Sequence, residues 1–315
     1  MQLSTYQRGL LIVVLGVVFL SFDGLLIRLA ATDGWTVIFW RGLLMFCVLG
    51  LICTVGQRLT ALRRPPVASL ASTVLLGVIS SLFVLAVMNA SVANVVLILS
   101  TAPLFAAVFS RMFLGERVAR HTLAAIVACM LGMSLVFMGH GAHGMLLGNL
   151  YALAASAAIG GNLTLLRRFP AVDTMTVVAG GGLLSAAVAL SMATPLALDA
   201  QRYGVLALMG LVQMPLATVL INSATRYLPS TEVALFYLVE TTLGTAWVWW
   251  LLGEAPSVST LIGGGVVILL LVWYGCIGLR LVRQRLRISP AFCAMEATPL
   301  HAHAMKSPRE CGLGR

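Results

Sequence analysis

Four ionisable side chains, Asp23, Arg28, Arg41 and Glu240, interrupt long apolar runs of this sequence. An ionised side chain at the centre of a bilayer costs about 2.5–3.5 kcal/mol on insertion scales. Each of these groups should therefore face a partner, a cavity or a solute. Glu240 lies nearest the middle of its run, so we expect it to line a solute pathway, where its carboxyl contacts a cationic group or takes up a proton. A structural role, paired with Arg41 or hydrogen-bonded to its neighbours, is the alternative.

Of the other three charges, Asp23 and Arg41 allow two interpretations each. Asp23 is either a cavity residue or a structural partner of Ser21 or Arg28, although the i,i+5 spacing to Arg28 suits a direct pair poorly. Arg28 lies near the end of its run, where a long cationic side chain reaches the lipid headgroups. Arg41 lies about six residues inside the next run, so we expect it to meet either a carboxylate partner or an anionic group of a solute.

Neutral polar residues within the runs form a second set of candidates. They could hydrogen-bond a solute, or join helices with an average contribution below about 1 kcal/mol in membranes. We assign four of them to the expected pathway: Asn94, Thr101, Gln213 and Asn222.

Three further residues are candidates because of their positions. Tyr237 precedes Glu240 by three residues and shares its helix face, so it is the preferred aromatic contact for a solute. Pro103 frees a backbone carbonyl and predicts a kink that could act in gating. Thr241 follows Glu240 directly and is a second gating candidate.

The elements that must position these residues are membrane-spanning helices. Of 315 residues, 60% are hydrophobic and 10% are charged, whereas soluble domains carry about 25% charged residues. A spanning helix needs about 20 predominantly apolar residues. Ten such runs are present, so we predict an all-α membrane protein with spans near 9–29, 35–55, 69–88, 92–113, 122–139, 146–166, 173–194, 204–223, 232–252 and 260–279.

The net charge of +10 is distributed as the positive-inside rule predicts. Fourteen arginines fall in alternate connections, whereas Arg202 alone falls in the opposite set. This alternation predicts a multi-pass protein of the inner (plasma) membrane with both termini cytoplasmic. It also argues against nucleic acid as a partner, because no nucleic-acid-binding motif accompanies the charge. The fourteen are Arg8, Arg58, Arg63, Arg64, Arg111, Arg117, Arg120, Arg167, Arg168, Arg226, Arg280, Arg283, Arg285 and Arg287.

The fourth and ninth runs end alike, on Leu-Gly-Glu at Glu116 and Glu254. These glutamates are 138 residues and five helices apart, and an odd number of helices reverses the orientation in the membrane. We therefore predict two inverted five-helix repeats, residues 1–140 and 141–280. Leu-Gly-Glu is also a common helix ending with glycine as the C-cap. The polar, proline-containing segment 281–315 is predicted to be a disordered cytoplasmic tail.

An ordered set of short segments resembles the EamA-like family of the drug/metabolite transporter superfamily. The segments are FWRG at 39–42, SVAN at 91–94, APLF at 102–105, FLGER at 113–117, STEVA at 230–234 and LVE at 238–240. The resemblance covers about residues 8–280. It implies ten helices around a central cavity, and export or exchange of amino acids, nucleotide-like metabolites, cofactors or drugs. Thr241 departs from the pattern, because the family usually has proline after this glutamate. We therefore expect the ninth helix to be straighter than in relatives with the proline, or to be bent by the Thr241 and Thr242 hydroxyls.

We therefore predict a secondary transporter that exports or exchanges small metabolites, such as amino acids, amines, cofactor-like or drug-like solutes, by alternating access. A non-transporting scaffold or sensor, and an importer of the same fold, are the alternatives. We predict no enzymatic activity, cofactor or metal, because no catalytic motif and no Cys/His metal spacing is present. The expected partners are a small solute, the lipid bilayer and protons as a candidate coupling ion, with a homodimer left open.

Overall fold

The structure is a computed structural model that describes residues 5–55, 66–89, 98–116, 120–137, 146–194 and 198–252, together with a few isolated positions. The packing described below lies within the unit Met1–Val272. Every regular element of the described residues is helical. Asn94, most of the predicted tenth span 260–279 and the tail 281–315 lie outside the described residues.

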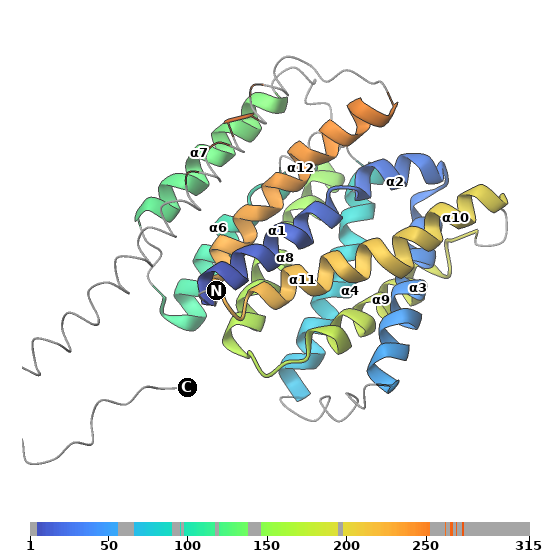
Figure 1. The fold of residues 1–315 in the computed structure, drawn as a ribbon, viewed down its shortest axis with the longest axis horizontal. Coiled ribbons are helices and arrows are strands. Elements are labelled where there is room, and N and C mark those ends of the chain that lie inside the picture. The colour runs from blue at the N-terminus through green and yellow to red at the C-terminus, as the bar shows by residue number, and fades with distance from the viewer. Residues whose placement is uncertain are drawn as a thin grey trace, which may run out of the picture. The chain divides into compact units, whose positions relative to one another are not determined.

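The first half of the chain forms helices with short connections (Figure 1). Two of its predicted spans are interrupted: the first is divided into α1 and α2, and the end of the fourth is divided into α6 and a π-helical turn, η2. The elements are α1 (Thr5–Leu20), α2 (Asp23–Ala30), α3 (Gly34–Val55), α4 (Pro66–Asn89), α6 (Ala102–Phe109), η2 (Ser110–Leu114) and α7 (Arg120–Phe137).

The second half of the chain is also helical, and one of its predicted spans is interrupted. Its predicted eighth span contains a π-helical turn, η3, between α10 and α11, which ends two residues before Pro215. Because proline has no N–H to donate, the preceding turn widens instead of continuing the α-helical hydrogen bonds. The elements are α8 (Leu146–Arg168), α9 (Thr174–Ala189), α10 (Ala200–Leu208), η3 (Met209–Gln213), α11 (Met214–Ala224) and α12 (Ser230–Leu252).

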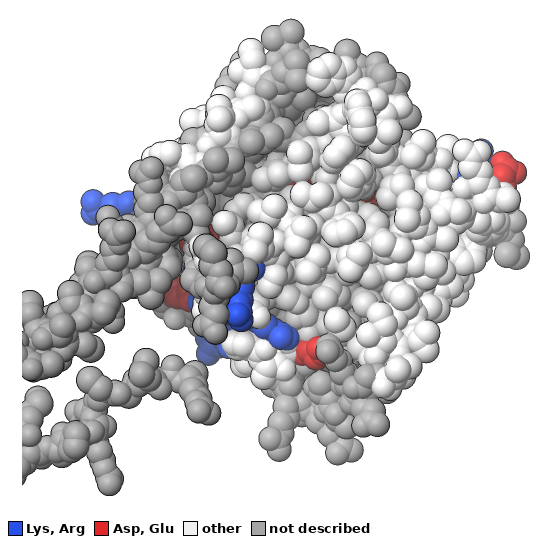
Figure 2. All heavy atoms as spheres, viewed as in Figure 1, with Lys and Arg blue, Asp and Glu red and all other residues white. Residues whose placement is uncertain are grey.

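Five stretches of the described residues are long and apolar enough to cross a membrane: Thr5–Ile27, Gly34–Val55, Val67–Ala86, Leu146–Arg168 and Ala200–Ala224. They coincide with the predicted spans that begin near 9, 35, 69, 146 and 204. Helices α7 and α12 also lie within a few residues of predicted spans. Figure 2 agrees with this assignment, because most of the described surface in that view is uncharged and the Arg, Asp and Glu side chains gather near its edges.

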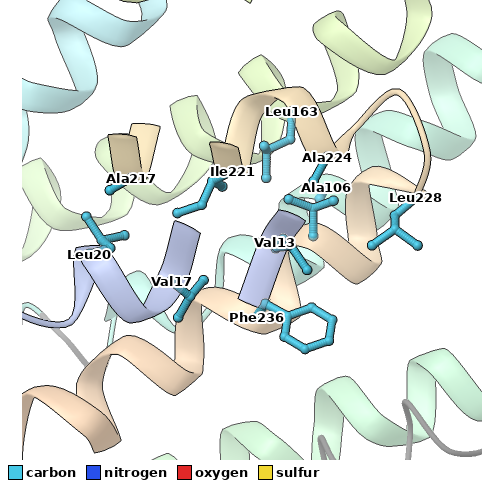
Figure 3. Close-up of a cluster of buried hydrophobic side chains, with 12 residues drawn as sticks. Val13, Val17, Leu20, Ala106, Leu163, Ala217, Ile221, Ala224, Leu228 and Phe236 are labelled. Atoms are coloured by element: carbon cyan, nitrogen blue, oxygen red, sulfur yellow. The ribbon is translucent and has the colours of Figure 1, made fainter. Parts of the chain in front are cut away.

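Helices from the two halves pack directly on each other: α1 on α11, α3 on α9, α4 on α8 and α9, and α6 on α8 and α12. One buried apolar cluster joins five of them and includes Val17 of α1, Ala106 of α6, Leu163 of α8, Ile221 of α11 and Phe236 of α12 (Figure 3). The halves therefore share one core.

Glycine allows the closest of these approaches. A Cβ atom on Gly42 of α3 would lie 2.5 Å from the carbonyl oxygen of Gly182 in α9, and a Cβ on Gly182 would lie 2.8 Å from the carbonyl oxygen of Gly42. Small residues at helix interfaces are how membrane helices gain close packing without a hydrophobic driving force.

Candidate functional site

A buried ion pair joins α2 to α3. The Arg41 guanidinium donates from Nη1 to Oδ2 of Asp23 at 3.4 Å, and the two residues are only 3% and 5% exposed. Arg41 also donates from Nη2 to the Ser80 hydroxyl of α4 at 2.9 Å. Arg41 thus has a carboxylate partner, which is one of its two predicted interpretations. That this partner is Asp23 was not predicted, because Asp23 was expected beside Ser21 or Arg28 and Arg41 was considered beside Glu240.

The break in the first span positions Asp23. Helix α1 ends at Leu20, and the Ser21 hydroxyl donates to the carbonyl of Val18 at 2.7 Å. Such back-bonding by serine competes with the helical ladder and bends helices. Asp23 then begins α2 and stands in its first turn, where the helix dipole favours a negative charge.

One face of α12 covers this break. Glu240, Gly244 and Trp247 are spaced by four and three residues and so lie on one side of the helix. A Cβ on Gly244 would lie 3.3 Å from the Ser21 carbonyl oxygen. Trp247 donates from Nε1 to the Ser21 hydroxyl at 2.9 Å, and its ring stacks on Phe22 with 4.7 Å between centroids.

Glu240 brings a third charge to this place. Its carboxyl interacts electrostatically with both Asp23 and Arg41, and its side chain is only partly buried. Tyr237, one turn earlier on α12, interacts electrostatically with Glu240 and packs against the core cluster of Figure 3. The structure therefore gathers Asp23, Arg41, Glu240 and Tyr237 from three helices.

Two buried oxygens at this place have no hydrogen-bond partner, Oδ1 of Asp23 and Oε1 of Gln213. Gln213 ends η3 and donates from Nε2 to the carbonyl of Phe19 at 3.1 Å, in the last turn of α1. Its amide therefore supports the carbonyl end of α1 where the helix breaks. Buried polar atoms without a partner are rare in proteins and mark places where a ligand or water can donate.

Two other predicted pathway residues contact different helices. The Asn222 amide oxygen accepts from Asn162 Nδ2 at 2.8 Å, and the Asn162 oxygen accepts from the Ser72 hydroxyl at 2.7 Å, which joins α11, α8 and α4. The Thr101 hydroxyl lies 2.9 Å from that of Ser156 in α8. Both residues make helix–helix contacts in this structure.

The predicted gating residues have different surroundings. Pro103 occupies the first turn of α6, where its missing N–H leaves no helical bond unmade, and the chain turns just before it at Ser100 and Thr101. Helix α12 continues without interruption through Thr241, whose side chain is outside the described residues, as is that of Arg28. Helix α6 therefore begins beside Pro103, and the predicted gating roles of Pro103 and Thr241 stay predictions.

Sequence reasoning missed Ser80, Phe22 and the contact of Trp247 with Ser21. Ser80 carried no signal, since serine is common in apolar runs. The tripeptide Ser21-Phe22-Asp23 did carry one, because two residues that favour helix ends lie in the middle of a run. Among the described residues, no group of three or more His, Cys, Asp or Glu is arranged to hold a metal ion.

A polar cluster ties the two halves together at the loop between α2 and α3. Asp33 accepts from the Thr36 amide at 2.9 Å and so caps α3, and the Thr194 amide donates to the Thr36 hydroxyl at 2.9 Å. Although partial burial opposes it, hydrogen bonds from Thr36 and Thr194 lower the pKa of Asp33 below its usual value.

At the other end of the helices, Arg167 pairs with Glu116 at 3.6 Å and donates to the Thr225 carbonyl at 3.2 Å.

Apolar helices long enough to span a bilayer, with charges paired inside them, define a multi-pass membrane protein. The model of the EamA-like transporter family matches this chain twice, over residues 7–138 and 146–274. The chain belongs to the EamA-like transporter family, a family of membrane transporters in the drug/metabolite transporter superfamily.

A solved structure titled "Crystal structure of protein" is similar in fold, with a TM-score of 0.72 and 19% sequence identity over 84% of this chain and 96% of that chain. The comparison with curated proteins gives no match.

Proposed function

We propose that this protein is a secondary transporter that exports or exchanges small metabolites across the inner membrane by alternating access. The observation that carries the proposal is the buried Asp23–Arg41 ion pair between apolar helices, with which the Glu240 carboxyl interacts electrostatically. Asp23 and Arg41 come from the first family match and Glu240 from the second. Ionisable groups inside membrane segments are costly, and in transporters they mark solute and ion pathways.

The proposed architecture has ten spans in two inverted repeats, residues 1–140 and 141–280, with both termini and the tail 281–315 in the cytoplasm. Two features support it: the double family match and the reversal of orientation that an offset of five helices produces. Solutes would bind between the repeats, beside the break between α1 and α2. Broken helices of this kind form the binding sites of several transporter folds.

The solute pathway is proposed to include Glu240, Asp23, Arg41, Tyr237 and Gln213. Asn94, Thr101 and Asn222 complete the predicted lining, and Pro103 and Thr241 are the predicted gating residues. Partners under this proposal are a small solute and the lipid bilayer, with protons as the candidate coupling ion. We propose no cofactor, metal or enzymatic activity.

A comparison of released metabolites tests this function. One culture makes the native chain, and the other makes equal amounts of Glu240→Gln. The matched control is Glu232→Gln, because Glu232 lies two turns earlier on α12 and hydrogen-bonds Tyr6. We expect cells with the native chain or Glu232→Gln to release a defined set of solutes, and cells with Glu240→Gln not to release them.

If the native chain releases nothing beyond the vector control under several metabolic loads, the export proposal fails, and import or a scaffold role takes its place. If all three chains release the same solutes, transport stands but the assignment of Glu240 to the pathway is wrong.

A further inference from the structure

Among the side chains that the structure describes, the charges at the break between α1 and α2 do not balance. Asp23 and Glu240 supply two carboxyls, and Arg41 is the described cation that interacts with both. When both carboxyls are ionised, the cluster carries one negative charge in excess. A buried charge without compensation is strongly unfavourable in a membrane, so a monovalent cationic group is the natural complement.

The unpaired atoms point to the same chemistry. Oδ1 of Asp23 and Oε1 of Gln213 are both hydrogen-bond acceptors, and both residues are more than nine-tenths buried. Acceptors are satisfied by a ligand that brings N–H or O–H groups. The guanidinium of Arg41 is already engaged by Asp23 and Ser80, which weakens it as a receptor for a solute carboxylate.

Aromatic rings adjoin the same charges. Phe22 directly precedes Asp23 and stacks on Trp247, and Tyr237 lies one turn from Glu240. Aromatic faces attract ammonium groups and also pack against apolar solute bodies. Carboxylates beside aromatic rings therefore suit a solute with a protonated amine on an apolar or aromatic body.

We infer that the transported solute is a monovalent organic cation whose protonated amine binds at the free oxygen of Asp23, next to Glu240. The inference rests on the proposed transport function and narrows its solute class. A solute carboxylate would lie against Asp23 and Glu240, so repulsion selects against zwitterions and anions of the same shape.

Counterflow in proteoliposomes with three probes of one shape tests the charge preference. Phenethylamine carries one positive charge at pH 7, phenylalanine is a zwitterion, and 3-phenylpropionate is an anion. With the full-length native chain in sodium-free buffer, we expect phenethylamine to exchange at least about tenfold faster than either of the others.

Two variants test whether the preference depends on the Glu240 carboxyl in particular or on any carboxyl of α12. Glu240→Gln removes the excess negative charge, so we expect phenethylamine exchange to fall at least about tenfold and the preference over phenylalanine to be lost. Glu232→Gln also removes a carboxyl from α12 and should leave both the rate and the preference unchanged.

Faster exchange of phenylalanine or 3-phenylpropionate than of phenethylamine would overturn the cation inference while the transport function stands. So would exchange of phenylalanine that requires sodium, because the positive charge would then come from an inorganic ion. If none of the probes exchanges, the cation inference is also wrong. The metabolite-release experiment described above then decides the transport function separately.

Discussion

Asp23 and Arg41 stand 18 residues apart on consecutive helices, and their charged groups meet at 3.4 Å where water has almost no access. Each charge is compensated by the other in the buried interior of the protein. Removing one partner of such a pair leaves a buried charge uncompensated and costs about 3–5 kcal/mol.

We therefore predict that Arg41→Met destabilises the protein by about that amount and abolishes transport. Thermal unfolding in detergent, followed by circular dichroism at 222 nm, measures the change. The double variant Asp23→Asn/Arg41→Met should recover part of the stability, because it removes the stranded charge. Arg202→Met is the control, since its pair with Asp199 is exposed and such pairs contribute about 0–1 kcal/mol. Equal losses for Arg41→Met and Arg202→Met would contradict a buried role for the pair.

The contact between Gly42 and Gly182 gives a second prediction. Gly42→Ala places a methyl group 2.5 Å from a backbone oxygen that cannot move away without shifting α9. Overpacking of this kind costs about 1–3 kcal/mol. The matched control is Gly204→Ala in α10, where a Cβ meets no atom within 4 Å. There alanine should be neutral or stabilising by up to about 1 kcal/mol. Parallel unfolding curves compare the two, and the prediction is wrong if Gly42→Ala is as stable as Gly204→Ala.

The sequence predicts the positions of most described helices because apolar length alone defines a span. The predicted span 35–55 and the helix Gly34–Val55 differ by one residue. The break at Ser21 and Phe22 was not predicted, because the apolar run continues on both sides of it and the signal carried by Ser21 and Asp23 was overlooked. The π-helical turn η3 was also missed, although Pro215 was a visible signal.

Site residues were harder to predict than helices because a partner depends on how two helices pack. The sequence supplied Asp23, Arg41 and Glu240 as costly groups in need of partners. For Asp23 it offered Ser21 or Arg28 as partner, and it considered Arg41 only beside Glu240. The Asp23–Arg41 pair was not predicted, because it depends on how α2 packs against α3. Ser80 and Trp247 were missed for the same reason, since their roles exist only in contact with another helix.

Asp33 predicts a pH dependence of stability. Its pKa is lowered in the folded protein, although burial opposes this, by the hydrogen bonds from Thr36 and Thr194. A group with a depressed folded pKa stabilises the protein above its unfolded pKa, which is about 4, and loses that contribution as pH falls through the folded pKa. Asp33→Ala, which also removes the cap of α3, should therefore cost about 1 kcal/mol at pH 7 and progressively less below pH ~4.

Unfolding temperatures of native and Asp33→Ala protein between pH 7 and pH 3 check this prediction. Asp199→Ala is the control, because Asp199 precedes α10 without a side-chain capping bond. A constant difference between native and Asp33→Ala protein at every pH would show that the carboxylate charge does not contribute.

The chain of hydrogen bonds from Ser72 through Asn162 to Asn222 gives a fourth prediction. Asn162→Ala leaves a buried hydroxyl and a buried amide oxygen without their partner. Interhelical hydrogen bonds in membranes average about 0.6 kcal/mol and reach about 1.7 kcal/mol. We expect a loss of about 1–2 kcal/mol, and a double-mutant cycle of Asn162→Ala with Ser72→Ala should give a coupling of about 0.6 kcal/mol. Strict additivity of the two substitutions would exclude the bond as a contributor.

The backbone contact between α3 and α9 also limits how the protein can move. Because the backbones at Gly42 and Gly182 approach so closely that neither position has room for a Cβ atom, moving these two helices apart would open a void that no side chain is present to fill. Under the proposed alternating access, motion of one half against the other must keep this contact closed and rotate about it. Displacements would then grow with distance from the contact toward the helix ends.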